Sequence, residues 1–317
     1  MLTVYTPRQP SLRAFLIGVS VFSLAVWAAG AAGDSPRFGH RVDRGVVEHA
    51  PIREASGLVA SRKNPDVLWV HNDSGQPNQV FAVGSRGSHL GTYVLDGVTN
   101  RDWEDIAIGP GPQDGQSYLY IGDIGDNRAR RDLKYIHRLP EPQLKAGPAA
   151  VHHLSTIETL SFRYPDGRRD AETLLVDPLT KDLYVISKRE AGVGVYRAAY
   201  PQSTSAPITL ERVATVVLEE QPSTEDWLVG GDIAPSGAEI LLKSYRAVYY
   251  WARAPGQTVH EALAARPIPL PYQPEPQGEA LGWKADGTGY YTLSEERDRI
   301  PARLYFYPRL PATAYEG

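Results

Sequence analysis

Acidic residues recur along the chain in five short segments of one pattern, in which an acid precedes small or apolar neighbours and a hydrophobic run. The five acids are Glu54, Glu104, Glu172, Asp232 and Glu279. Successive subtraction gives gaps of 50, 68, 60 and 47 residues between them. Repeats of this period that hold several strands each favour a β-propeller. We therefore expect the five carboxylates to line one end of a central channel, as ligands for a divalent cation, with Ca²⁺ as the best fit.

Polar loops are expected to open on the same end of the propeller, because they connect the second and third strands of each repeat. Asp73 follows one such strand, and the run Asp123-Ile-Gly-Asp126-Asn127 follows another. These side chains would add oxygen ligands to the cation site. The alternative for this run is a tight turn in which Asp and Asn side chains bind backbone amides.

Several residues at this end are candidates for catalysis. Glu104 and Glu172 would act as metal ligands or bases, and Lys188 and Arg246 would neutralise charge that develops on a substrate. His71 lies near Asp73 and is a further candidate for a general base. A second interpretation is structural, because each acid may instead be used to bind backbone amides of the adjoining repeat and lock the ring.

The strand-like segments fall into five groups, which predicts an all-β protein with five propeller blades and leaves six as the alternative. The last group has three strands, so a strand within residues 45–52 is expected to close the ring and remove exposed edges. The resulting domain limits are a signal segment at 1–33, an irregular linker at 34–44 and one propeller domain at 45–317.

The N-terminus has the features of an export signal. Arg8 and Arg13 precede an apolar run from Ala14 to Ala29, and small residues follow up to Gly33. We expect cleavage near 30–33 and a secreted or bacterial periplasmic protein. An uncleaved membrane anchor is the alternative, because the run approaches the length that spans a bilayer.

The amino-acid composition excludes some kinds of ligand and binding partner. The chain has 317 residues, a net charge of −4 and no cysteine, which excludes disulfides and thiolate metal ligands. No basic stripe interleaved with aromatic residues occurs, which argues against nucleic acid as a partner. We expect a monomer that binds a small-molecule substrate or a protein partner, with no membrane contact beyond the export signal.

Four strings resemble a group of poorly characterised secreted bacterial β-propellers that are loosely similar to TolB-like and phytase-like propellers. The strings are Glu-Ala-Ser-Gly-Leu (54–58), Trp-Val-His-Asn-Asp-Ser-Gly (69–75), Asp-Trp-Glu-Asp-Ile-Ala (102–107) and Tyr-Ile-Gly-Asp-Ile-Gly-Asp-Asn (120–127). In phytase-like propellers, calcium ions at an acidic mouth bind substrate phosphates. The resemblance implies such a strand pair at Asp170-Ala-Glu172 and 183–188, while elsewhere the phytase pattern does not match.

Two functions follow from these observations. One is a metal-assisted hydrolase or lyase that acts on a small anionic or polyhydroxylated molecule at the acidic mouth. The other is a non-catalytic propeller that binds a ligand or a protein, since no recognisable pair of nucleophile and base occurs and one fold serves unrelated roles.

Overall fold

The computed structural model describes residues 36–219 and 222–311. These described residues form one compact unit. The predicted signal segment and its cleavage site lie outside the described residues. Helix is scarce in the described ranges, where the elements are η1 (Thr224–Asp226) and α1 (Val259–Leu263). Neither range contains a helix with the length and hydropathy needed to cross a bilayer.

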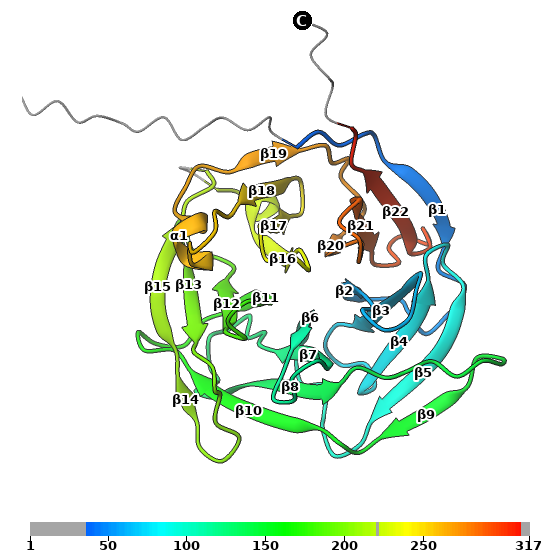
Figure 1. Cartoon of the computed structure of the whole chain (residues 1–317), viewed down its shortest axis with the longest axis horizontal. Coiled ribbons are helices and arrows are strands. Elements are labelled where there is room, and N and C mark those ends of the chain that lie inside the picture. The colour runs from blue at the N-terminus through cyan, green and yellow to red at the C-terminus, as the bar shows by residue number, and fades with distance from the viewer. Residues whose placement is uncertain (1–35, 220–221, 312–317) are drawn as a thin grey trace, which may run out of the picture. The chain divides into compact units, whose positions relative to one another are not determined.

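Five sheets, mostly antiparallel, stand around a common axis as the blades of a propeller (Figure 1), which confirms the prediction of five blades. The first blade consists, from the axis outward, of β2 (Ala55–Ala60), β3 (Val67–Asn72), β4 (Gln79–Gly84), β5 (His89–Leu95) and β9 (Val151–Leu154). The second consists of β6 (Trp103–Pro110), β7 (Ser117–Asp123), β8 (Lys134–Pro140), β10 (Glu158–Arg163) and β14 (Ile208–Thr209).

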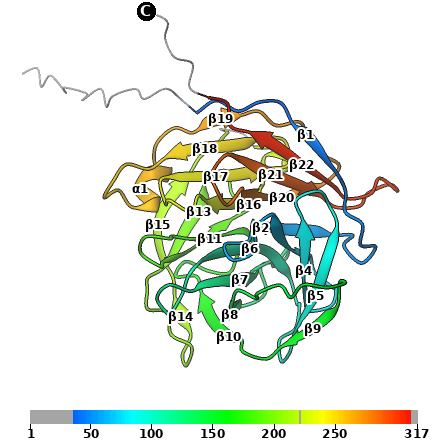
Figure 2. The same cartoon turned by 45° about the vertical axis from the view of Figure 1, so that its right-hand side comes forward.

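The other three blades have four strands each. The third consists of β11 (Ala171–Val176), β12 (Leu183–Ser187), β13 (Val193–Ala198) and β15 (Glu211–Val216). The fourth consists of β16 (Leu228–Ile233), β17 (Glu239–Ser244), β18 (Val248–Ala252) and β19 (Ile268–Leu270). The fifth consists of β20 (Gly278–Trp283), β21 (Gly289–Ser294), β22 (Arg303–Pro308) and β1 (Val42–Val46). Figure 2 shows the strands of the fourth blade side by side.

The N-terminal strand β1 closes the ring by pairing with β22 from Val42↔Phe306 to Val46↔Arg303. Closure agrees with the prediction, but the strand starts before Gly45 and so lies partly in the segment expected to be an irregular linker. The chain leaves the sheet after Val46 and turns between His49 and Ile52, where the Ile52 amide donates to the His49 carbonyl at 2.9 Å. The apolar residues that suggested a strand at 45–52 are buried because Val47 and Ile52 pack into the core.

Two outer strands cross between neighbouring blades. β9 follows the third strand of the second blade in sequence, yet it pairs in parallel with β5 of the first blade. β14 lies between two strands of the third blade in sequence, yet it pairs in parallel with β10 of the second blade. Both strands thus extend the sheet of the preceding blade and tie adjacent blades together.

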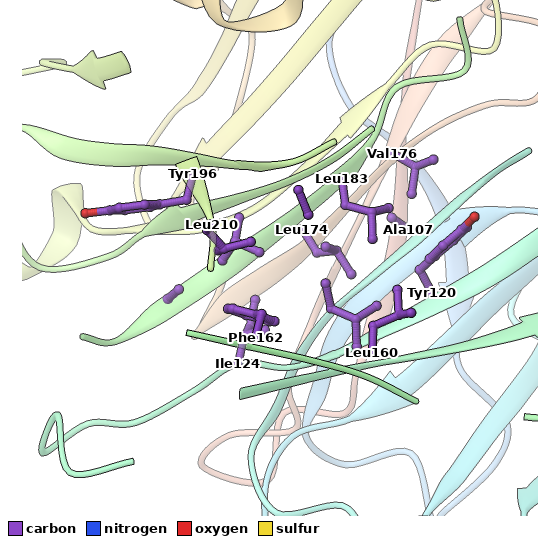
Figure 3. Packing of buried hydrophobic residues seen from close by; sticks show 14 of the residues in the cluster. Ala107, Tyr120, Ile124, Leu160, Phe162, Leu174, Val176, Leu183, Tyr196 and Leu210 are labelled. Carbon is purple, nitrogen blue, oxygen red and sulfur yellow. The ribbon is translucent and has the colours of Figure 1, made fainter. Parts of the chain in front are cut away.

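The core lies between the faces of adjacent blades. β2, β11, β16 and β20 are buried at every residue, as expected for the innermost strands of a closed ring. Figure 3 shows the cluster between the second and third blades, where Leu174 of β11 lies near Ala107 and Leu160. Because such interiors are close-packed, removal of a side chain there leaves a cavity.

We expect Leu174→Ala to lower the free energy of unfolding by about 2 to 5 kcal/mol, because it removes a fully buried side chain from this cluster. Leu179→Ala is the matched control, since Leu179 follows the same strand and is 62% exposed. The control should change the free energy by less than about 0.5 kcal/mol. Urea unfolding of the two variants measures both values, and equal losses would contradict the assigned packing.

Candidate functional site

Each innermost strand carries a register shift at its beginning, where one residue has no partner on the second strand. The extra residues are Ser56, Glu104, Glu172, Val229 and Glu279. A bulge of this kind leaves the extra residue out of the ladder and re-aims its side chain. Three of the five predicted acids therefore occupy equivalent positions at one end of the ring.

The other two predicted acids, Glu54 and Asp232, do not occupy the bulge positions of their strands. Glu54 comes two residues before the bulge residue Ser56, in the position that Asp102 and Asp170 occupy ahead of Glu104 and Glu172. Asp232 lies three residues beyond Val229, deeper along the axis. Its carboxylate accepts a hydrogen bond from the backbone amide of Trp283 at 2.8 Å, so it links the fourth blade to the fifth.

Glu104 is the centre of the acidic cluster. Carboxylate oxygens of Asp73, Asp102 and Glu104 lie within 4.8 Å of one another, and the same holds for Glu104, Asp170 and Glu172. Glu104 thus belongs to both groups. The backbone approaches it closely at Gly125, where an added Cβ would lie 1.9 Å from Glu104 Oε1. Glycine at this loop position leaves room for the carboxylate.

Glu172 and Glu279 are joined through a buried network. Lys188 Nζ pairs with Glu172 Oε1 and donates to Tyr245 Oη at 3.3 Å. Tyr245 in turn donates to Glu279 Oε1 at 2.7 Å. Glu172 Oε2 is buried and has no hydrogen-bond partner within the described residues. One carboxylate oxygen therefore remains free for a ligand.

We call the six carboxylates of this cluster the acidic end of the ring. They are Asp73, Asp102, Glu104, Asp170, Glu172 and Glu279. Three of them have a basic partner: Arg131 lies 2.6 Å from Asp102, Arg189 lies 2.7 Å from Asp170, and Lys188 contacts Glu172. For Asp73, Glu104 and Glu279, no Lys, Arg or His nitrogen of residues 36–219 or 222–311 lies within the 4.0 Å limit of an ion pair. Half of the carboxylates at the acidic end therefore lack a basic partner among the described residues.

Burial, and then repulsion between neighbouring carboxylates, raises the pKa values of these groups. Burial is the main cause that raises the pKa of Glu104 well above its ordinary value, and Glu172 and Asp73 raise it further. Burial also raises the pKa of Glu172, although Lys188 opposes the change. Burial raises the pKa of Asp73 to about 7. The neighbouring Glu295 has a pKa raised to about 8, by burial first and then by Glu279 and Asp73.

The predicted ligands Asp123 and Asp126 do not converge on one point. Asp123 is paired with Arg101, whose Nε lies 2.9 Å from its carboxylate. Asp126 accepts from the backbone amide of Arg131 at 2.7 Å and from Lys134 Nζ at 3.2 Å. These hydrogen bonds and charges outweigh burial and lower the pKa of both carboxyls.

Asn127 lies at the edge of the acidic end. Its Oδ1 accepts from Arg189, the same arginine that pairs with Asp170. Glu54 lies on another side of this end, where its carboxylate accepts from Gln76 Nε2 at 2.6 Å. Both side chains are thus engaged by protein donors.

His71 lies inside the first blade. Its Nδ1 lies 2.9 Å from the Asn72 carbonyl oxygen, and a Cβ added at Gly57 would lie 2.5 Å from its Nε2. Its ring meets the Trp103 ring edge-on, with centroids 5.8 Å apart. Burial lowers the pKa of His71 to about 4. The structure therefore places this imidazole, neutral at pH 7, against β2 and Trp103 in the interior of the ring.

Arg246 is half-exposed and forms ion pairs with Asp226 and Glu219. It lines a cavity of about 520 Å³ together with Trp227, Tyr245, Glu275 and Arg297. Since the Tyr245 hydroxyl also bonds to Glu279, this cavity adjoins the acidic end.

The sequence contained a signal for Asp102 and Asp170, which were not among the metal ligands predicted from the repeat. Asp102 and Asp170 each precede a bulge glutamate by two residues, as Asp-Trp-Glu and Asp-Ala-Glu. In an extended strand, residues two apart lie on the same face. This spacing could therefore have indicated that each aspartate lies on the same side as the glutamate that follows it. Tyr245 could not have been identified as the link between Lys188 and Glu279, because that contact depends on how three blades meet.

No family model matches the chain, and no curated protein matches its sequence. Among solved structures it is similar to hydrazine synthase of Kuenenia stuttgartiensis, with 10% identity and a TM-score of 0.44 over 81% of this chain and 83% of that chain. It is also similar to a luciferin-regenerating enzyme, with 11% identity and a TM-score of 0.44 over 86% of this chain and 95% of that chain. A third similar structure is U3-55K, with 11% identity and a TM-score of 0.41 over 86% and 100%. At these values the similarities assign no chemistry to this chain, and the propeller fold follows from its own strand order.

The stability of the metal-free protein should fall as pH rises from about 6.5 to 8.5. The folded-state pKa of Glu295, about 8, lies above its ordinary value of 4.5, so the folded state binds more protons than the unfolded state in this window. Below about pH 6.5 the depressed pKa of His71 makes the stability rise with pH, so the prediction is limited to pH values above this range. One such proton changes the free energy of unfolding by at most about 1.4 kcal/mol per pH unit.

Glu295→Gln should make this pH dependence shallower, as measured by urea unfolding at several pH values. Glu296→Gln is the control, because its side chain is 42% exposed and it follows Glu295 directly. A slope unchanged by Glu295→Gln would contradict the assignment of the proton to this carboxyl.

Proposed function

We propose that the acidic end binds a divalent cation, with Ca²⁺ as the first choice, and that the cation holds a small anionic or polyhydroxylated molecule. The observation that carries this proposal is the position of Glu104, whose carboxylate is shared by two groups of closely spaced carboxylates. Buried charges in proteins are normally paired or coordinate a metal.

The charge balance supports a cation. Glu104 is 3% exposed and Glu172 is 4% exposed, so water does little to screen their repulsion. A divalent cation would offset the unpaired charge and would give Glu172 Oε2 a partner. The candidate ligands are all oxygen atoms, and Ca²⁺ accepts six to eight of them in irregular arrangements. This donor set favours Ca²⁺ over Zn²⁺, which prefers nitrogen and sulfur.

The adjoining cavity supports a small molecule as the ligand. Its volume of about 520 Å³ is in the range of small-molecule sites. Arg246 and Arg297 line it and can recognise anionic groups. Trp227 and Tyr245 provide rings against which the face of a cyclic molecule can pack.

Catalysis by this site would be metal-assisted hydrolysis or elimination. A bound cation would polarise the substrate and lower the pKa of bound water. Glu104 and Glu172 would hold the cation, and the ammonium of Lys188, which reaches both Glu172 and Tyr245, would orient or stabilise an anionic group. The competing role is ligand binding without turnover. It is favoured because the Lys188 ammonium already contacts Glu172 and Tyr245 and is thus less available to a substrate.

Addition of Ca²⁺ to metal-free protein should raise the Tm by about 5 °C when the ion exceeds its Kd a hundredfold, because the ion binds the folded state. Glu104→Gln should abolish most of this rise, since it removes the shared ligand at nearly constant volume. Glu211→Gln is the control, because Glu211 lies on the outer strand β15 with its side chain 67% exposed. Scanning fluorimetry with EDTA, Ca²⁺, Mg²⁺, Zn²⁺ and Mn²⁺ measures the shifts, and no response to any ion would refute a metal site.

Turnover should be detectable with Ca²⁺ on some member of a panel of phosphoesters, lactones and acidic sugars. The double variant Glu104→Gln with Glu172→Gln should lower kcat/KM by at least about a hundredfold, because both carboxylates hold the cation. Full activity of the double variant would exclude the hydrolase or lyase mechanism. Calcium-dependent binding without turnover would support the non-catalytic role.

A further inference from the structure

A second cavity lies at the end of the ring opposite to the acidic end. The loops that follow the innermost strands of the first four blades meet there around a space of about 310 Å³. Its lining includes Arg62, Pro110, Gln116, Ser117, Pro178 and Pro235. Arg62 also lines an adjoining cavity of about 350 Å³ that reaches the loop at Lys284 in the fifth blade. Arg62 thus stands where loops of all five blades come together.

The Arg62 guanidinium has no protein partner in the described part of the chain. Its Nη1 is buried without a hydrogen bond, and no carboxylate of residues 36–219 or 222–311 lies within the 4.0 Å limit of an ion pair. Two fully buried arginines differ from Arg62, whose side chain is half-buried. Arg253 donates to both oxygens of Asp177 at 2.7 and 2.9 Å, and Arg138 donates twice to Glu158 at 2.9 and 2.7 Å.

The nearest acids are already engaged by other donors. One oxygen of Glu141 accepts from Trp69 Nε1 at 3.0 Å and from the backbone amide of Arg62 at 3.1 Å. The other oxygen of Glu141 accepts from the hydroxyl of Ser117. Asp232 accepts from the Trp283 amide. These acids influence Arg62 through space but leave its side-chain donors free.

We propose that Arg62 forms a binding site for a small oxyanion, a carboxylate or phosphate group, in the cavity opposite to the acidic end. A guanidinium nitrogen buried without an acceptor, as Nη1 is, costs free energy, which an anion bound to this side chain would recover. The planar fork of arginine matches the two oxygens of a carboxylate or phosphate. Gln116, which also lines the cavity, is a candidate second donor.

The experiment compares the Tm of the full chain in sodium phosphate, sodium acetate and sodium chloride at equal ionic strength, with EDTA present throughout. Phosphate or acetate should raise the Tm of the wild type by at least about 2 °C more than chloride. A response to phosphate alone identifies a phosphate site, and a response to acetate identifies a carboxylate site. A response no larger than that to chloride would overturn the proposal.

Arg62→Met should abolish the specific response, and an unchanged response in this variant would overturn the proposal. Arg168→Met is the matched control, because Arg168 is exposed and pairs with Asp132 on the surface, and it should respond as the wild type does. Arg62→Lys keeps the charge without the fork and should weaken anion affinity at least about threefold. If Arg62→Met does not fold, the comparison of Arg62→Lys with the wild type decides, and equal affinity counts against the proposal. Glu104→Gln should keep the anion response, which separates this site from the proposed metal site.

Discussion

The pairing of β1 with β22 is the contact on which the ring depends, because it joins the first described strand to the last. Without it, the fifth blade would lack its outer strand and would expose the hydrogen-bonding groups of β22. Closure also assembles the acidic end. Glu279 and Glu295 come from the fifth blade and Asp73 comes from the first, so the repulsion of Asp73 by these two glutamates exists only when the two blades are adjacent.

Carboxylates along the axis serve two purposes. The position of each acid relative to the bulge in its inner strand decides which purpose it serves. Asp105, one residue past the bulge in β6, accepts from the backbone amide of Leu174 in the next blade at 2.9 Å. Asp232 makes the equivalent kind of bond to Trp283. These acids lock neighbouring blades together through backbone amides. Among the described residues no backbone amide donates to the carboxylates of the bulge glutamates, which lie near one another and gather acidic groups at one end of the ring.

The strand pattern was predictable because alternating apolar residues and turn residues are local signals. The propeller, the five blades and the N-terminal closing strand followed from them. The start of β16 could not be predicted, because Asp232 was expected to precede the hydrophobic run of its repeat and the strand already begins at Leu228. Gly230 and Gly231 interrupt the apolar pattern that would have indicated a strand there. The acids of the site were recognisable as a repeat, but the separation of Asp232 from Glu104 depends on bulge positions that the sequence does not display. The burial of His71 was also not predictable. The sequence places it near Asp73 and the polar loops, whereas in the structure it packs against Gly57 and Trp103.

The crossing strands β9 and β14 constrain the order in which the molecule can assemble. The first blade is incomplete until the ribosome has synthesised Leu154, well after the second blade has begun, and the second blade must wait for Thr209 of the third. The fifth blade combines the beginning of the described chain with its end. Nascent chains therefore carry open sheet edges through most of synthesis, and the pairing of β1 with β22 can form only after the last described strand has been made.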